Sequence, residues 1–115
     1  NIINYFKSKN YSLCLVTMQC MNAAKIILDK MQILELFSSI VTRDVLHERH
    51  LQIKKSIDVL PLSTNEIIMV GDRINDVKSA KQVGCPVILF NKDKLNSFTE
   101  CQVISNLSEL KKLIS

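Results

Sequence analysis

The sequence predicts an α/β fold in which helices cover both faces of a parallel sheet, giving three layers. Its 115 residues alternate between helical segments and short apolar segments, as repeated strand–helix units do. The apolar segments are continuous rather than alternating, which is typical of strands buried on both faces. Three of them end in polar residues, at Thr17, at the turn of residues 42–44 and at residues 71–76, where open parallel sheets bind their ligands.

The first forty residues contain a helical start followed by alternating strand-like and helix-like segments. Ile2, Ile3 and Phe6 recur at helical spacing, and Asn10 suits the left-handed residue that ends a helix. Strands are expected over the apolar runs at residues 13–17 and 39–42. The helical segments between them are expected at residues 22–31 and 34–37.

A longer helix is expected over residues 51–60, because Pro61 cannot continue it. The apolar residues expected on its inner face are Leu51, Ile53, Ile57 and Leu60.

The second half predicts two further strands, two helices and a short edge strand. Residues 67–70 form the clearest apolar run, and the helix after them is expected to stop at Gly84. A buried strand follows over residues 86–90. Val103 and Ile104 suit a brief edge strand, and a final helix is expected over residues 107–114 with Asn106 or Ser108 as its cap.

Length and composition indicate one domain over residues 1–115, without an internal boundary. The net charge of +4 comes without a stripe of aromatic and basic residues, so we expect no nucleic-acid partner. No apolar stretch approaches the length of a membrane span. The four cysteines form no CxxC pair and the two histidines complete no zinc pattern, so a reduced, cytoplasmic protein is expected.

The most informative motif is GDRIND at residues 71–76. Two carboxylates, Asp72 and Asp76, leave the end of an apolar strand and enter a helix, and Gly71 would allow a tight turn. Hard oxygen ligands of this kind suit Mg²⁺. Considered alone, Asp72 is equally well explained as a turn residue and Asp76 as a helix cap.

Residues 67–87 as a whole resemble the fourth motif of the haloacid-dehalogenase superfamily, especially its phosphoglycolate-phosphatase-like hydrolases. Residues 13–17, a hydrophobic strand ending in Thr17, resemble the second motif, and the resemblance extends over essentially the whole chain. It implies a Rossmann-like core whose N-terminal side is incomplete here.

The resemblance also implies roles for particular residues. Thr17 would hydrogen-bond the transferred phosphoryl group, and Asp72 would bind Mg²⁺ directly. Asp76 would support the water shell of the metal or orient the base of the third motif. The side chains of Thr17, Asp72 and Asp76 are then expected at one edge of the sheet.

The third motif of the superfamily supplies a Lys or Arg, and here the sequence departs from the usual pattern. Arg49 is preferred because it starts a helix near the strand ends, and Lys54 is the second choice. Counting back from Gly71 in the commoner register gives His47 instead. All three assignments remain open.

The first motif, DxDxT, supplies the nucleophile in this superfamily, and no two aspartates of the chain are spaced by one residue. We therefore expect a fragment whose parent is a Mg²⁺-dependent phosphatase. The parent would hydrolyse a small phosphorylated metabolite through an aspartyl-phosphate, while this chain alone would be inactive. The alternative is a non-catalytic module that binds a partner or a phosphorylated ligand. The cap that sets specificity is not recognisable, so the substrate stays undefined.

Overall fold

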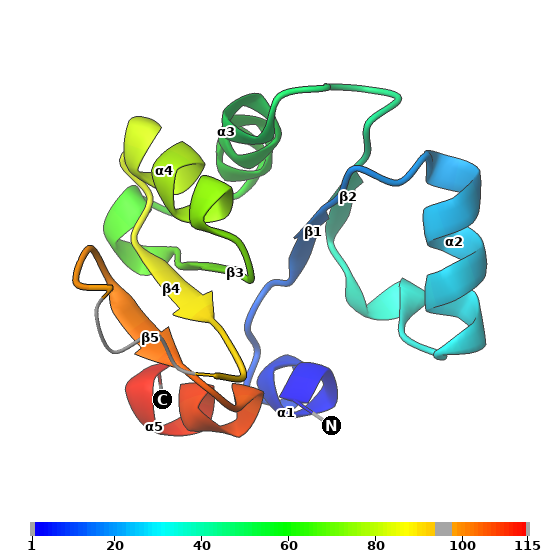
Figure 1. Ribbon diagram of the computed structural model, residues 1–115. Helices are drawn as coiled ribbons and strands as arrows, with labels where there is room; N and C mark the ends of the chain where they lie inside the picture. The colour runs from blue at the N-terminus through cyan, green and yellow to red at the C-terminus, as the bar shows by residue number, and fades with distance from the viewer. Residues whose placement is uncertain (1, 94–97, 115) are drawn as a thin grey trace. The chain divides into compact units, whose positions relative to one another are not determined.

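The structure, a computed structural model, describes residues 2–93 and 98–114 (Figure 1). The chain divides into two compact units, Asn1–Leu60 and Pro61–Ser115. That the two together form one domain remains a prediction.

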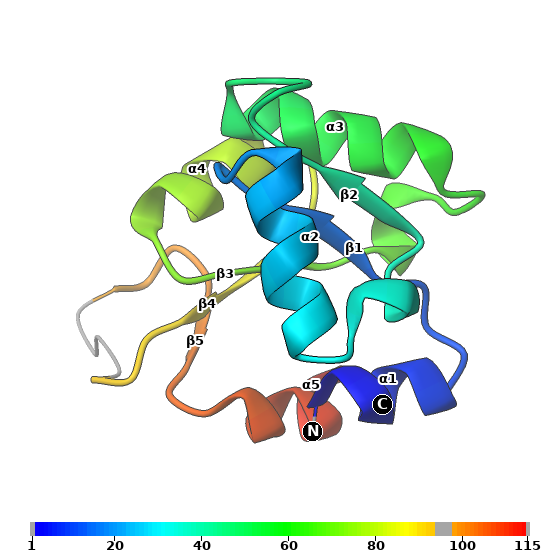
Figure 2. The same cartoon turned by 90° about the vertical axis from the view of Figure 1, so that its right-hand side faces the viewer.

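The first unit is built around a pair of parallel strands, β1 (Cys14–Val16) and β2 (Ser39–Val41). Their register pairs Cys14 with Ser39 and Val16 with Val41. Helix α2 (Met21–Lys30) connects them and leads into the short helical turn η1 (Leu34–Leu36). Helix α3 (Arg49–Val59) lies on the other side of the strand pair from α2, and Figure 2 views the pair from the α2 side. This helix–sheet–helix layering is the predicted one.

Helix α1 (Ile2–Ser8) ends as the sequence predicts, with Asn10 in a left-handed conformation at φ 67°. The main-chain N–H of Asn10 donates to Lys7 O and that of Tyr11 donates to Phe6 O, each at 3.1 Å. These two bonds form a Schellman motif, which satisfies carbonyls that the end of the helix leaves open.

The inner face of α3 differs from the predicted one. Leu51 was expected to point inward but is 41% exposed, whereas Gln52, Ile53 and Ser56 are buried. The Gln52 side chain hydrogen-bonds to carbonyl groups of the two loops beside it, as described below, and this fixes the rotation of the helix. Ile53 is buried as predicted, and Ile57 and Leu60 are half-buried, so the apolar pattern was wrong for Leu51 and missed the buried polar residues.

The second unit contains three parallel strands in the order β3 (Met69–Gly71), β4 (Val87–Phe90) and β5 (Gln102–Ile104). A helical turn, η2 (Thr64–Glu66), precedes β3, and helix α4 (Ile74–Gln82) joins β3 to β4. The chain closes with the turn η3 (Leu107–Glu109) and helix α5 (Leu110–Ile114). Figure 1 shows α4 on one side of the strands and α5 on the other.

The core of this unit lies between α4 and the strands. Val77, Leu89 and Val103 are buried together, with Val87 and Phe98 packed against them. Helix α4 ends just before Gly84, as the sequence predicts, and Gly84 has φ 74°. Asn106 caps the last helical segment, since its Oδ1 accepts the Ser108 N–H at 2.9 Å while Glu109 Oε2 accepts the Asn106 N–H at 3.0 Å.

The α/β class and the parallel pairing of every described strand confirm the predicted fold. The strand expected over residues 67–70 begins two residues later than predicted, because its pairing with β4 begins at Met69. None of the helices in the described ranges combines the length and the apolar character needed to cross a membrane.

Candidate functional site

In the first unit, Thr17 and Thr42 directly follow β1 and β2, so they stand at the carboxyl end of the same strand pair. Main-chain hydrogen bonds tie the two loops together beyond the strands. Thr17 N–H donates to Val41 O at 3.0 Å, and Arg43 N–H donates to Gln19 O at 3.3 Å. The loops are therefore held in register past the last strand residues.

The Thr17 hydroxyl caps the turn that follows β1. Its Oγ1 accepts the Gln19 N–H at 3.1 Å, and the side chain is half-buried. A hydroxyl that accepts one bond still has its own proton to donate. The structural role therefore does not exclude a hydrogen bond from Thr17 to a ligand oxygen.

The Thr42 hydroxyl is different, because it is fully buried and Oγ1 has no hydrogen-bond partner among the residues that the structure describes. A buried hydroxyl without a partner is a destabilising group. The two threonines that follow neighbouring strands thus differ in exposure and in bonding.

Gln52 lies behind this edge and was not singled out from the sequence. Its side chain is fully buried, and Nε2 donates to Thr17 O at 2.8 Å and to Leu46 O at 3.0 Å. Its Oε1 accepts a hydrogen bond from Arg49 Nη1 at 3.2 Å. The only sequence signal for it was its spacing from Ser56, four residues on, which puts two polar residues on one face of a helix.

The three candidates for the third-motif cation have different surroundings. Arg49 is the first residue of α3 and is half-buried beside Gln52. Lys54 Nζ lies 3.1 Å from Asp58 Oδ1 in a pair that is more than half exposed. His47 is exposed in the loop before α3. The choice among them remains a prediction.

Asp44, in the loop after β2, caps the start of α2. Its Oδ2 accepts the Met21 N–H at 2.7 Å. A carboxylate at the N-terminus of a helix offsets the partial positive charge there.

In the second unit, Asp72 directly follows β3 and is exposed, whereas Asp76 is 5% exposed within the first turn of α4. Asp76 Oδ2 accepts the Arg73 N–H at 3.2 Å. Asp76 therefore acts as a helix cap, which was one of the two interpretations of Asp76 that the sequence allowed. The expected roles of Asp72 and Asp76 in binding a metal remain predictions.

Gly71 is needed for a reason other than the expected tight turn. Its φ is not in the left-handed region, since Gly84 is the glycine with positive φ. A Cβ on Gly71 would lie 2.7 Å from Asp76 Oδ2 and closer still to Asp76 Cβ. Glycine at this position therefore allows the carboxylate of Asp76 to fold back over the end of β3.

The residues present fit a partial site for Mg²⁺. Asp72 offers an exposed hard oxygen ligand at a strand end, but no group of three or more His, Cys, Asp or Glu residues within the described ranges could hold a metal. Magnesium commonly uses one or two carboxylates, with water and phosphate oxygens completing its shell. Asp72 suits the part of one such carboxylate.

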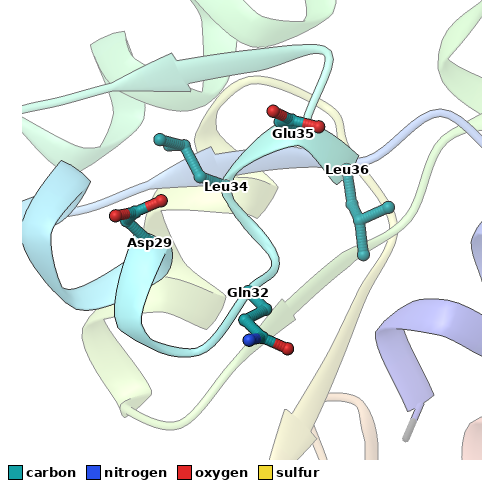
Figure 3. Close-up of a pocket in the computed structure, with 5 residues that line it drawn as sticks. All are labelled: Asp29, Gln32, Leu34, Glu35 and Leu36. Atoms are coloured by element: carbon teal, nitrogen blue, oxygen red, sulfur yellow. The ribbon is translucent and has the colours of Figure 1, made fainter.

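A separate hollow of about 270 Å³ lies where α2 passes into η1 (Figure 3). The residues that line it are Asp29, Gln32, Leu34, Glu35 and Leu36. It contains none of the predicted site residues, and its two carboxylates do not suit a phosphorylated ligand.

Residues 1–90 match the family model for haloacid dehalogenase-like hydrolases. A comparison with curated proteins found no match.

Several solved structures share the fold. A haloacid-dehalogenase phosphatase from Thermococcus onnurineus is 24% identical with a TM-score of 0.88, over 98% of this chain and 54% of its own. The magnesium-bound structure described as HAD-hydrolase YfnB from Bacillus subtilis is 17% identical with a TM-score of 0.86, over 98% of this chain and 53% of its own. A predicted phosphoglycolate phosphatase from Haemophilus somnus is 20% identical with a TM-score of 0.83, over 99% and 54%. The chain thus spans about half the length of these structures.

Proposed function

The chain belongs to the haloacid dehalogenase-like hydrolase family, and on that premise we propose that the full-length protein is a Mg²⁺-dependent phosphatase. The proposed substrate is a small phosphorylated metabolite. The observation that carries the proposal is the position of two residues, Thr17 and Asp72. Each directly follows a parallel strand and keeps its side chain at least partly exposed.

In this proposal, Thr17 donates its hydroxyl proton to a phosphoryl oxygen. The bond from Gln19 N–H to Oγ1 fixes the oxygen and leaves that proton available. A neutral donor adds no negative charge next to a phosphate dianion, which a carboxylate at this place would do.

Asp72 is proposed to hold Mg²⁺, and Asp76 to hold the turn that presents Asp72. Bound Mg²⁺ would neutralise charge on the phosphoryl oxygens. Asp76 contributes by capping α4 through the Arg73 N–H, which fixes the main chain next to Asp72. Arg49 is proposed as the cation of the third motif, ahead of Lys54, whose ammonium pairs with Asp58.

The nucleophile is proposed to be an aspartate outside these 115 residues, since no two aspartates here are spaced as in the DxDxT motif. Attack on phosphorus and hydrolysis of the aspartyl-phosphate would then need the longer protein. The phosphatases among the similar structures support hydrolysis of phosphomonoesters as the reaction class.

The test is hydrolysis of p-nitrophenyl phosphate by the full-length protein, with and without Mg²⁺. Asp72→Asn should lower kcat/KM about 100-fold or more, because it removes a charged metal ligand without changing shape. Asp29→Asn, which makes the same change on the exposed side of α2, serves as the matched control and should leave kcat/KM unchanged. Undiminished activity in Asp72→Asn would refute the assignment of Asp72.

The same experiment separates the phosphatase from a non-catalytic module. A full-length protein that hydrolyses no phosphomonoester in the presence of Mg²⁺, yet binds inorganic phosphate, would favour the module.

A further inference from the structure

We infer that Gln52 is a positioning residue for the phosphoryl contact: its buried amide fixes the main chain of Thr17 and orients the guanidinium of Arg49. This inference rests on the proposed function of Thr17. It is carried by a set of hydrogen bonds that all lie within the first unit.

The orientation of the Gln52 amide follows from its partners. Two main-chain carbonyls, Thr17 O and Leu46 O, lie 2.8 Å and 3.0 Å from Nε2. A carbonyl oxygen can only accept, so the NH₂ group must face them. The opposite atom, Oε1, then faces Arg49 Nη1 at 3.2 Å, where it accepts. One side chain therefore uses its two donors and its acceptor at once.

Three hydrogen bonds hold Thr17, through its N–H, its carbonyl and its hydroxyl oxygen. Its N–H donates to Val41 O at 3.0 Å, its carbonyl accepts from Gln52 at 2.8 Å, and its Oγ1 accepts from Gln19 N–H at 3.1 Å. The bond from Gln52 is the one that comes from outside the strand pair and its turn. Removing it would free the Thr17 peptide to rotate, and the hydroxyl would then lose its fixed direction.

Burial makes this arrangement stringent. Gln52 is fully buried, so no water can easily replace its amide at the two carbonyls. A methionine would fill similar space but leave both carbonyls without a donor. A glutamate would be worse at neutral pH, because a carboxylate would place lone pairs against two carbonyl oxygens. Glutamine is the residue whose shape and hydrogen-bonding groups fit all three partners.

Ser56, one turn further along α3, bonds to the main chain of Gln52. Ser56 Oγ donates to Gln52 O at 3.1 Å, and Ser56 is buried as well. The bonds of the Gln52 side chain to Thr17 O and Leu46 O are the ones that fix the rotation of α3 relative to β1. Gln52 accordingly links the start of α3, where Arg49 lies, to the end of β1, where Thr17 lies.

The experiment measures kcat and KM for p-nitrophenyl phosphate in the full-length protein and in Gln52→Met. We expect kcat to fall about tenfold or more with KM changed less than about threefold, because a misplaced donor weakens transition-state contacts more than binding. Gln82→Met, a change at an exposed glutamine of α4, is the control and should keep the wild-type values. A Gln52→Met protein with kcat within about twofold of wild type overturns the inference.

Gln52→Glu gives a pH readout that loss of packing alone would not produce. A protonated glutamic acid regains one O–H donor, whereas the carboxylate has none. Its activity relative to wild type should therefore rise as the pH falls from about 8 to about 5.5, since burial and the two facing carbonyl oxygens raise the pKa of the carboxyl group more than the Arg49 guanidinium lowers it. A ratio of Gln52→Glu activity to wild-type activity that does not change with pH overturns the inference. This test remains decisive even if Gln52→Met fails to fold.

Two exchange measurements need no catalytic activity, so failure of the proposed function stays distinguishable. In the wild type, the side-chain NH₂ of Gln52 should exchange with solvent slowly by NMR, and rapid exchange overturns the inference. In Gln52→Met, exchange of the Gln19 N–H, which reports on the Thr17 turn, should accelerate about tenfold while that of Leu89 in the second unit stays constant. An unchanged Gln19 rate likewise overturns the inference.

Discussion

The side chain of Asp76 fills the space beside Gly71 in which the Cβ of any other residue would lie. That Cβ would come within 2.9 Å of Asp76 Cγ and within 2.7 Å of Oδ2. Gly71 is buried at the end of β3, and Asp76 is buried at the start of α4. The strand end, the turn with Asp72 and the helix cap therefore form one tightly packed element.

Gly71→Ala should destabilise the protein by about 1–3 kcal/mol, the usual cost of overpacking a rigid site. The nearest neighbour is the Cβ of Asp76 rather than the tip of a flexible side chain, so relaxation must move the main chain. Urea unfolding followed by circular dichroism measures the change. An unfolding free energy within about 0.5 kcal/mol of wild type would show that the turn adapts without cost.

Gly84 provides a contrasting case, because an added Cβ would meet nothing within 4 Å while φ is +74°. Gly84→Ala should cost about 1 kcal/mol through backbone strain alone. Gly84→Asn should cost less, since asparagine tolerates the left-handed region. Equal losses for Ala and Asn, measured by the same unfolding experiment, would contradict strain as the cause.

The sequence predicts the order of helices and strands because that order depends on local signals. Asn10 has the expected left-handed conformation at φ 67°, and α4 ends just before Gly84, as predicted, with Gly84 at φ 74°. Of the two expected candidates for the last cap, Asn106 and Ser108, it is Asn106 that caps the helical turn. Such residues act through their own backbone preferences and close neighbours, and these are visible in the sequence.

Features that depend on distant partners were not predicted. Leu51 was placed inward and Gln52 was overlooked, because the rotation of α3 is set by carbonyls of Thr17 and Leu46, which lie 35 and 6 residues away. The need for glycine at Gly71 was attributed to a turn, whereas it comes from the fold-back of Asp76. The shared edge expected for Thr17 and Asp72 remains a prediction, because these residues lie in separate units.

Substitution of Asp44 tests the cap of α2 and changes no residue of the proposed site. Its carboxylate accepts the Met21 N–H at 2.7 Å. Asp44→Ala should lower the unfolding free energy by about 0.5–2 kcal/mol, the range for a lost helix cap. Asp44→Asn keeps a hydrogen-bond acceptor but loses the charge, so it should lower the unfolding free energy less than Asp44→Ala does. Because salt screens the interaction of the charge with the helix, this smaller loss should decrease further in high salt. A loss in Asp44→Asn equal to that in Asp44→Ala at every salt concentration would assign the effect to charge alone.

Cys85 and Cys20 are predicted to differ in thiol reactivity. Burial raises the pKa of the Cys85 thiol above its ordinary value of 9.0, and a hydrogen bond with the backbone of Met69 opposes this only in part. Since the thiolate is the nucleophile, Cys85 should react slowly with iodoacetamide at pH 8, whereas the exposed Cys20 should react first. Peptide mass spectrometry over time gives the order. Modification of Cys85 before Cys20 would contradict the buried placement.

The same shift gives a pH dependence of stability. The folded state holds the Cys85 proton more tightly than the unfolded state, so the associated stability is fully present below the unfolded pKa. It is lost as the pH rises through the raised folded pKa. Between about pH 8 and pH 10, the wild type should therefore lose more unfolding free energy than Cys85→Ala does. Parallel curves for the two proteins would contradict this sign.

Thr17 and Thr42 form the sharpest pair for testing the proposed site, because they follow neighbouring strands and differ in bonding. Thr17→Val removes a hydroxyl that accepts the Gln19 N–H, and should cost about 1 kcal/mol of unfolding free energy. Thr42→Val removes a buried hydroxyl that has no partner within the described ranges. It should be neutral or stabilising by up to about 1 kcal/mol, because an unsatisfied group is replaced by a methyl group of similar size.

Activity then separates a cap from a phosphate contact. If Thr17 serves only the turn, Thr17→Val alters stability and leaves kcat/KM close to wild type. If its hydroxyl also donates to the phosphoryl group, kcat/KM falls about tenfold or more, and Thr17→Ser, which restores the donor, recovers most of that loss. Thr42→Val keeps full activity in either case, since its hydroxyl is fully buried. Assays of p-nitrophenyl phosphate hydrolysis by the full-length protein at a temperature where all variants are folded decide between the two roles. Wild-type kcat/KM in Thr17→Val would remove Thr17 from the proposed site and leave it as the residue that ends β1.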